Sequence, residues 1–472
     1  MKEVGVEHPI VAKKIQNSLN ISLKEAAVNS GSTSLGLSYI SPFALAMNAT
    51  SSQIGILDAV ISLLPNIVQL KGANLLRYFS RNKLVNITSW IKTLLWIPII
   101  LTGYLFYIGV PHMVWALIAL VGIYYSVSSV HQVAWFSWMG SLVPEERRGD
   151  YFSKRNYVAG LFGLFFMILG AIILDSFKKI GQVSGDIVGY TLLGFGILFL
   201  MSSIFRMWSK NLLLKQYEPR IHIRKKDDMT LKIFIQRMRE TSFGKFVLYN
   251  SFFKLAAAIA SPFFAVYMIR NLGLSYFWFM IITVASVVFR LIFMPLIGKI
   301  SDKFGNVLLM KISSGVIFLI PFAWIASTLF VTEISVKIYL LLVPSMISGF
   351  AWSAYDLAEN NYIYDSIKSR RRGYALSFMN FFGGIGLFIG ASIGSILAIL
   401  PITFMNPILF IFLVSGIARF LVPMIGIRYL EEVRSVKKFS PQYIIREFAP
   451  ARGIVQEAHH LEHLVKNVEH NI

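Results

Sequence analysis

The sequence predicts an all-α membrane protein with 12 transmembrane helices, arranged as two related bundles of six. Three observations support this prediction. The 472-residue chain is 56% hydrophobic and 15% charged, which is more apolar than an ordinary soluble domain. Twelve of its segments are apolar over roughly 20 residues, the length that crosses a bilayer. One stretch of the first half also recurs in the second half.

This recurrence matches residues 147–170 to residues 371–394 at a constant offset of 224 positions. Each copy runs from a basic turn into an apolar segment with small residues at helical spacing. The identical pairs are Arg147/Arg371, Arg148/Arg372, Gly149/Gly373, Ser153/Ser377, Asn156/Asn380, Gly160/Gly384 and Gly170/Gly394. An offset of nearly half the chain indicates that one half repeats the other, as in parallel-repeat membrane proteins.

The 12 spans are expected between turn signals and polar breaks. Their approximate ranges are 25–48, 53–76, 84–107, 113–139, 154–175, 187–208, 246–269, 276–298, 307–329, 337–362, 374–399 and 407–428. The first is the least apolar, so it should face other helices or water rather than lipid. The expected domains are an N-terminal segment (1–22), a bundle (23–208), a linker with an amphipathic helix (209–245), a second bundle (246–428) and a tail (429–472).

Basic residues predict the orientation. The formal charge is +21, and most Lys and Arg fall in alternate loops and in the linker. Cytoplasmic loops carry such an excess and face anionic lipid, so both ends of the chain should be cytoplasmic, in the plasma membrane. This reading replaces nucleic-acid binding as the explanation of the charge. No apolar run stands beside the N-terminus, so no cleaved signal peptide is expected.

A short loop after the eighth span carries a family resemblance. Residues 298–306 read GKISDKFGN, which resembles the G-x-x-x-D-[RK]-x-G signature of the major facilitator superfamily. Gly298 should allow close helix packing, Asp302 should meet a helix N-terminus and nearby Arg, and Gly305 should allow the turn. Lys303 completes the motif. In the first half, Leu76 stands where the acid would be expected.

The resemblance implies two bundles that rock about a central site and expose it to each side in turn. Helices one, two, four and five of each half would line the site, and helices three and six would face lipid. The cytoplasmic gate would combine the loop motif with Arg147, Arg148, Arg371 and Arg372. The implied function is secondary transport of a small solute by a monomer, and we expect protons to be the coupling ion.

Three other functions stay open at this stage: a membrane receptor or scaffold of the same fold, a transporter of lipid substrates, and an intramembrane transferase. Such a transferase would need a metal, but no clustered acids or paired histidines lie within the spans. No catalytic residue, resident cofactor or metal site is therefore expected. His459 and His463 lie one turn apart in the tail, where a solvated helix is the expected structure.

Ionisable groups within spans are costly, so they are the first candidates for a site. In the tenth span Asp356, Glu359 and Asn360 share one helical face. Burial and mutual repulsion favour protonation of such carboxylates, which suits a proton carrier. The alternative is a cytoplasmic gate paired with the basic loop that follows. We also expect Lys254 or Arg290 to pair with Asp356 or Glu359, unless Lys254 snorkels to the interface.

The first half offers weaker candidates. His131 and Gln132 lie in the fourth span, where His131 could gate by titration or could be a hydrogen-bonded structural residue. Asn156 and Asn380 occupy equivalent positions, and a buried amide there could bind substrate or join helices. Lys92 and Arg419 lie in spans expected to face lipid, where packing or snorkelling is expected.

Overall fold

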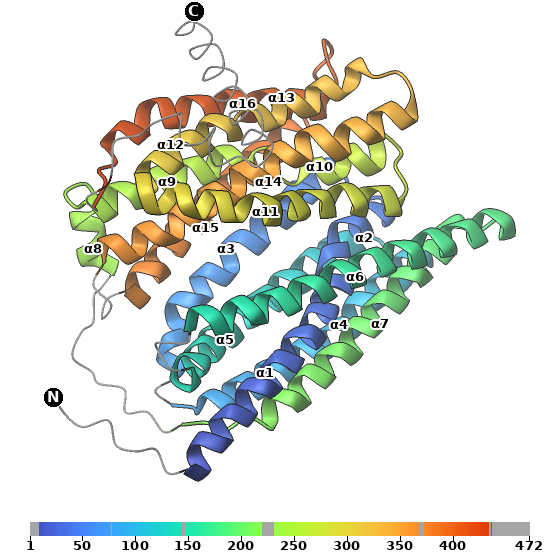
Figure 1. The fold of residues 1–472 in the computed structure, drawn as a ribbon. Helices are drawn as coiled ribbons and strands as arrows, with labels where there is room; N and C mark the ends of the chain where they lie inside the picture. Colours follow the sequence, from blue (N-terminus) through green and yellow to red (C-terminus); the bar gives the residue numbers. More distant parts are fainter. Residues whose placement is uncertain are drawn as a thin grey trace, which may run out of the picture.

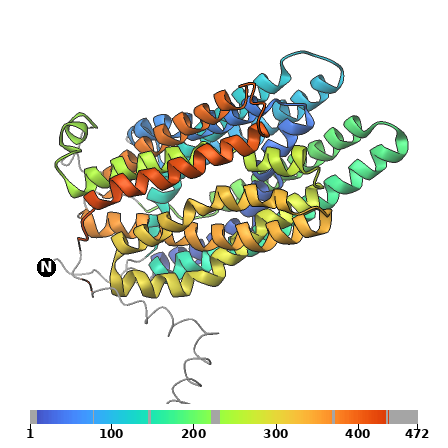
Figure 2. The same cartoon turned by 90° about the horizontal axis from the view of Figure 1, so that it is seen from above.

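The computed structural model describes residues 9–76, 78–143, 148–219, 231–367, 372–433 and 436, and these are almost entirely helical. Long helices run side by side along the molecule (Figures 1 and 2). Within this described part, 11 helical segments are long and apolar enough to cross a membrane. The more polar α1 would be the twelfth, so the protein is an all-α membrane protein of about 12 spans.

Six long helices, the short helix α2 and one 3-10 turn make up the described part of the first half. In order they are α1 (Pro9–Leu35), α2 (Ile40–Ala46), α3 (Ser51–Leu75), α4 (Arg81–Tyr107), α5 (Met113–Leu142), α6 (Arg148–Ser184) and α7 (Ile187–Leu214), with a 3-10 turn η1 (Leu37–Tyr39) between α1 and α2.

The second half begins after the linker helix α8 (Leu231–Arg237). Its elements are α9 (Ser242–Ala258), α10 (Phe263–Val266), the π-helix η3 (Tyr267–Asn271), α11 (Tyr276–Phe304), α12 (Asn306–Ile317), α13 (Leu319–Ala326), η4 (Ser327–Leu329), α14 (Glu333–Ser366), α15 (Arg372–Leu397), α16 (Pro407–Gly426) and η6 (Ile427–Tyr429). In the linker helix, Phe234 is buried against Phe378 and Phe382 of α15, and Ile235 is exposed.

Two expected boundaries are wrong. The first helix begins at Pro9 rather than near residue 25, and a 3-10 turn interrupts the span after Leu35. Polar residues extend this helix because they are buried between helices rather than set in lipid: Ser22, Ser32 and Ser34 are all buried, which confirms that this face meets protein. The seventh span is broken after Ala258, since Pro262 has no N–H for a continuous helix.

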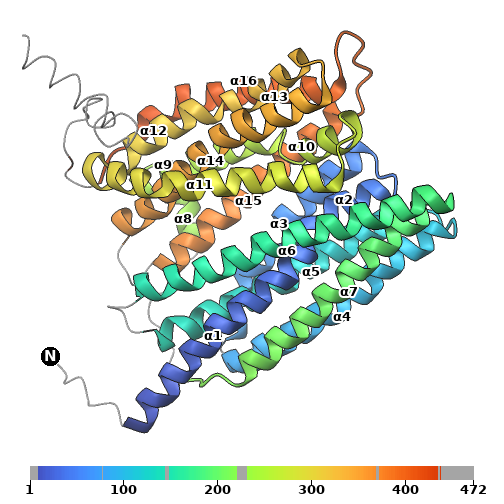
Figure 3. The ribbon, with the colours of Figure 1, turned by 45° about the vertical axis from the view of Figure 1, so that its right-hand side comes forward.

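The two halves lie closest at the end that holds α2 and α10, and they spread toward the end where α1 begins (Figures 1 and 3). We call the end where α1 begins the linker end, and the end that holds α2 and α10 the far end. Helix α3 packs along α15, where small residues permit close approach. A Cβ added at Gly384 would lie 2.3 Å from Asn66 Nδ2, and one at Gly55 would lie 2.1 Å from Ser395 Oγ. Helix α6 packs along α11.

Candidate functional site

A buried ion pair joins α9 to α14 in the second half. Lys254 Nζ lies 2.6 Å from Glu359 Oε1, and Asn250 Nδ2 donates to the same oxygen at 2.9 Å. Tyr355 OH in turn donates to Asn250 Oδ1 at 2.9 Å. The side chains of Glu359 and Lys254 are 8% and 22% exposed, so Lys254 points into the protein instead of snorkelling. A buried carboxylate is thereby matched by a cation and an amide.

A second ion pair lies next to the first on α14. Arg290 Nη1 of α11 lies 2.8 Å from Asp356 Oδ2, and these side chains are 40% and 33% exposed. The expectation that Lys254 or Arg290 pairs with Asp356 or Glu359 is confirmed, and both pairs form. Asn360 is exposed and donates to the carbonyl oxygen of Asp356 within its own helix, so it joins neither pair.

Aromatic side chains pack beside these charges. The rings of Phe253 and Tyr355 stack with centroids 4.6 Å apart, and Trp352 contacts both rings. Tyr355 and Phe253 are fully buried. The aromatic cluster holds Tyr355 in place to orient Asn250, and through it the carboxylate of Glu359.

The first half holds an ion pair that the sequence analysis missed. Arg155 Nη2 of α6 lies 2.8 Å from Glu25 Oε2 of α1, and Ser209 of α7 donates to Glu25 Oε1 at 2.7 Å. The guanidinium also stacks over Trp135 of α5, 4.3 Å from the ring centroid. Glu25 is 3% exposed. It escaped notice because the first span was expected to start at residue 25, which placed this acid at the edge.

Arg206 and Lys92 are also buried in the first half. Arg206 of α7 is 3% exposed and donates to Asn29 Oδ1 of α1. Lys92 of α4 is 4% exposed, with its Nζ 5.4 Å from the Tyr124 ring centroid. Of the two expectations for Lys92 and Arg419, packing or snorkelling, packing is confirmed. Lys92 lies against Tyr124 of α5, and Arg419 of α16 is 2% exposed.

The structure does not bring the remaining polar candidates together. His131 Nδ1 lies 3.1 Å from Thr88 Oγ1 and 3.4 Å from Ser89 Oγ, both on α4, which fits a hydrogen-bonded structural residue. Gln132 is exposed. Asn156 is exposed and Asn380 is half-buried, so the expectation of a buried amide at both repeat positions is wrong for Asn156.

The signature loop between α11 and α12 differs in part from expectation. Gly305 has φ +91°, which confirms that the turn needs glycine. The close helix packing expected at Gly298 does not occur, because a Cβ added there would meet nothing within 4 Å. Asp302 is exposed, and among the described residues it makes neither the expected contact with a helix N-terminus nor one with an Arg. Lys303 lies over Phe304, 5.6 Å from the ring centroid.

Another acid caps the helix after this loop. Glu432, beyond α16, accepts a hydrogen bond from Val307 N at 2.9 Å, at the first turn of α12. Its Oε2 would lie 2.3 Å from a Cβ at Gly305. Nearby, Ser301 Oγ donates to Asn306 Oδ1 at 2.7 Å, and Asn306 Nδ2 donates to Asp365 Oδ2 at 2.6 Å. These contacts tie the linker ends of α11, α12 and α14 together.

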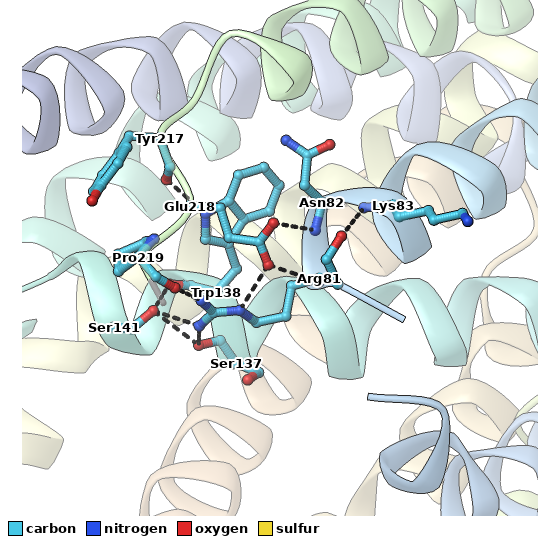
Figure 4. Close-up of polar contacts among 10 residues, drawn as sticks. Arg81, Asn82, Lys83, Ser137, Trp138, Ser141, Tyr217, Glu218 and Pro219 are labelled. Atoms are coloured by element: carbon cyan, nitrogen blue, oxygen red, sulfur yellow. Dashed lines mark hydrogen bonds and ion pairs between the residues drawn. The ribbon is translucent and has the colours of Figure 1, made fainter. Parts of the chain in front are cut away.

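The first half has the equivalent cap, although Leu76 replaces the loop acid. Glu218, just beyond α7, accepts from Arg81 N at 2.8 Å and from Arg81 Nε at 3.2 Å (Figure 4). The Arg81 guanidinium also donates to Ser141 Oγ at 2.6 Å and to the carbonyl oxygen of Pro219. Arg81 and Val307 are 226 positions apart, as are Leu76 and Asp302 of the two loops. A carboxylate from beyond the sixth helix therefore caps the third helix in both halves.

The four repeat arginines lie at the edge of what the structure describes. Arg147 and Arg371 are outside the described residues. Arg148 and Arg372 begin α6 and α15, but their side chains are not described. The tail with His459 and His463 is also outside. Among the described residues, no group of three or more His, Asp or Glu is placed to hold a metal.

Hydrogen bonds between the halves, where both partners are described, gather at the far end. Asp175 of α6 accepts from Tyr276 N and Phe277 N at 3.0 Å each, which caps α11 across the interface. Arg270 Nη2 donates to the carbonyl oxygen of Ala49 at 2.7 Å. The ring of Tyr276 also contacts that of Phe195, with centroids 5.5 Å apart. The far end is therefore closed.

Comparisons with known proteins agree with this architecture. A family model described as Major Facilitator Superfamily matches residues 246–456. A search of curated proteins gives no match. Among solved structures, a D-xylose–proton symporter is similar with a TM-score of 0.65 at 15% identity, covering 89% of this chain and 99% of that one. A nucleoside transporter has a TM-score of 0.61 at 12% identity, covering 88% and 99%.

A bacterial homologue of the iron transporter ferroportin is similar in two states. Its inward-facing structure has a TM-score of 0.63 at 14% identity, covering 88% of this chain and 99% of that one. Its outward-facing structure has a TM-score of 0.55 at 15% identity, covering 87% and 99%. The second half of the chain therefore matches the major facilitator superfamily, and the whole chain has the fold of these solved transporters.

Proposed function

We propose that this protein carries a small solute across the plasma membrane by alternating access, coupled to protons. The linker end, where α1 begins and where Glu432 beyond α16 caps α12, faces the cytoplasm. The observation that supports this best is a buried carboxylate–cation pair in each half: Glu25 with Arg155 and Glu359 with Lys254. The helices that bear these pairs are the first, fifth, seventh and tenth, those that the family resemblance assigns to the central site.

Buried carboxylates of this kind can couple proton binding to a change in the conformation of the protein. When Glu359 is ionised, it binds Lys254 and Asn250 and so holds α9 against α14. Protonation would remove the charge that attracts the ammonium, and the two helices would be free to separate. Asp356 and Arg290, which are more exposed, are the groups that a solute would contact first. His131 is assigned a structural role in this proposal.

The arrangement of the halves supports an inward-facing state. Asp175 and Arg270 close the far end, and the halves spread toward the linker end (Figure 3). Asp302 is exposed, as expected of a cytoplasmic latch that is open. The higher similarity to the inward-facing ferroportin homologue points the same way. Residues 209–245 would then form the cytoplasmic linker between the bundles.

The test begins with purified protein in detergent. Its thermal stability is measured against sugars, nucleosides, amino acids, organic acids and lipophilic cations at two pH values, because a ligand of the native state raises stability by mass action. Any solute that stabilises is then tested for uptake into liposomes with an imposed pH gradient. We expect saturable uptake that the gradient accelerates, and loss of that acceleration in Glu359→Gln.

Two results would count against the proposal. If uptake is saturable but equally fast with and without the pH gradient, proton coupling is rejected and solute transport is retained. Stabilisation by a solute that never enters liposomes would favour a receptor or scaffold of the same fold.

A further inference from the structure

A cavity of about 320 Å³ lies inside the second half, and none of the residues of the two ion pairs lines it. It is lined by residues of α9, α10, α11, α13, α14, α15 and α16 and by the break after α9. Its volume is at the lower end of the range for small-molecule sites, roughly 300–1,000 Å³. The cavity adjoins the ion pairs along two helices: Ser286 lies one turn from Arg290, and Trp352 lies one turn from Asp356.

Arg419 supplies the only charge among the lining residues. Its side chain is buried, and its Nη2 donates to the carbonyl oxygen of Ala257 at 2.8 Å, at the broken end of α9. Its Nε has no hydrogen-bond partner, and within the described part of the chain Arg419 forms no ion pair. A guanidinium in this position is desolvated without an acid to balance it.

The broken end of α9 offsets part of this charge. Carbonyl groups at a helix C-terminus carry roughly half an elementary negative charge and so stabilise a nearby cation. Capping the helix end is the structural role of Arg419, and Ser415 assists by donating to the Ala256 carbonyl oxygen at 2.7 Å. A remainder of positive charge faces the cavity, and buried ions are stable only when they are paired.

Other lining groups fit an anion with an apolar body. Ser261 and Ser348 make no hydrogen bonds with the rest of the described chain, so their hydroxyls are available as donors. Trp324, Trp352 and Phe264 supply aromatic surface. With one cation and no lining carboxylate, the charge balance suits a monoanion better than a phosphate dianion. A planar guanidinium matches a carboxylate through paired N–H donors.

We propose that this cavity binds a small organic monocarboxylate with an aromatic or apolar body, held by Arg419. As a binding site, it stands on its own contacts. The assignment of such an anion as the carried solute rests on the proposed transport function. An anion there would lie about one helical turn from Arg290 and Asp356, close enough to influence that pair as it enters or leaves.

Binding is tested on the purified full chain with sodium benzoate, by isothermal titration and by thermal shift, in buffer with matched sodium chloride. Benzamide is the neutral ligand of the same shape, and inorganic phosphate is the dianion. We expect saturable stabilisation by benzoate and none by benzamide or phosphate. Arg419→Gln should weaken benzoate binding at least about tenfold, because it removes a charged hydrogen-bond donor. Arg428→Gln, an exposed arginine just beyond α16, is the matched control and should bind as the native chain does.

Because Arg419 also caps α9, Arg419→Gln could fail to fold. Ser348→Ala leaves that cap intact and should weaken benzoate binding severalfold. Equal stabilisation by benzamide and benzoate, or unchanged benzoate binding in Arg419→Gln, would overturn the anion site.

The liposome assay separates the two proposals. Binding of benzoate without uptake would leave the site standing and reject this class of anion as cargo. Saturable uptake of a neutral solute by a protein that does not bind benzoate would leave the transport function standing and overturn the anion site.

Discussion

Glu359 and Asp356 lie one turn apart on α14, yet their ion pairs contribute differently to the stability of the fold, because one pair is more buried than the other. Glu359 and Lys254 are largely buried, whereas Arg290 and Asp356 are each about one-third or more exposed. Removing one partner of a buried pair leaves an uncompensated charge and costs about 3–5 kcal/mol. An exposed pair contributes about 0–1 kcal/mol. The Glu359–Lys254 ion pair therefore contributes to stability, whereas the Asp356–Arg290 ion pair changes stability little.

Glu359→Gln should therefore destabilise the protein by about 2 kcal/mol, below the cost for a fully buried pair because Lys254 is 22% exposed. Thermal unfolding in detergent measures this. The double variant Glu359→Gln with Lys254→Met should recover part of the loss, since neither charge is then left unpaired. If the double variant is less stable than Glu359→Gln, the pair does not have the energy assigned to it.

Asp356→Asn should change stability by less than about 1 kcal/mol, because water screens this pair. In the same variant, uptake of any solute that the native protein carries should fall, since Arg290 loses its partner in the proposed path. Asn360→Ala is the control, as this exposed side chain bonds only to its own helix. If Asp356→Asn takes up the solute as fast as the native protein does, the Asp356–Arg290 pair does not lie in the solute path.

Among the helices, the turn from α11 to α12 depends on one backbone conformation. Gly305 has φ +91° and ψ 168°, a combination that residues with a Cβ adopt only at a cost of about 1–3 kcal/mol. The carboxylate of Glu432 fills the space where a Cβ would stand. A side chain at this position would strain the turn and also displace the cap of α12.

Gly305→Ala is expected to cost about 2 kcal/mol or more, from strain and from loss of the Glu432 cap. Gly298→Ala is the matched change in the same loop motif, inside a helix with open space around it. It should be neutral or stabilise by up to about 1 kcal/mol. Thermal unfolding of both variants compares them directly, and equal effects would contradict the assigned role of Gly305.

The carboxylate caps on the third helix of each half should also contribute to stability. Glu218→Gln keeps the shape of the side chain but loses the negative charge at the start of α4 and the ion pair with Arg81 (Figure 4). A loss of about 1–2 kcal/mol is expected, because helix caps and partly buried charges are each worth about 1 kcal/mol. Glu240→Gln, at an exposed position, should have no effect. Limited proteolysis of the linker would show whether Glu218 anchors it to α4.

For the whole molecule, the balance between the two halves sets which side is open. Asp175 holds two backbone N–H groups of α11 from the opposite half, with Lys178 stacked on Tyr276 beside it, 5.8 Å from the ring centroid. These contacts exist only while the far end is closed. A ligand or a mutation shifts such an equilibrium only through contacts that differ between its states.

Asp175→Asn should shift the population toward the state that is open at the far end, because the charge at the α11 N-terminus is lost. The chain contains no cysteine, so spin labels can be placed on Lys179→Cys and Asn271→Cys without background. We expect the fraction of long label distances to rise about threefold or more, for a cap worth roughly 0.7–1 kcal/mol. Ser176→Ala is the control on the same turn, and an unchanged distance distribution in Asp175→Asn would exclude the latch.

Much of this architecture follows from local pattern. Apolar length predicted the spans, the offset of 224 predicted two related halves, and the loop motif predicted a turn at Gly305. The partners of Arg290 and Lys254 were also predicted, because ionisable groups in apolar helices must find counter-charges. These features depend on residues that are close in sequence or on rules that hold for any helix in a bilayer.

Tertiary packing decided the rest. Glu25 became half of a buried pair because α1 begins 16 residues before the expected start, and its polar surface is covered by α6 and α7. Arg419 and Lys92 turn inward, and Gly298 faces open space, because the rotation of each helix about its axis depends on its neighbours. Helical periodicity shows which residues share a face. Only the packing of the whole bundle determines what that face contacts.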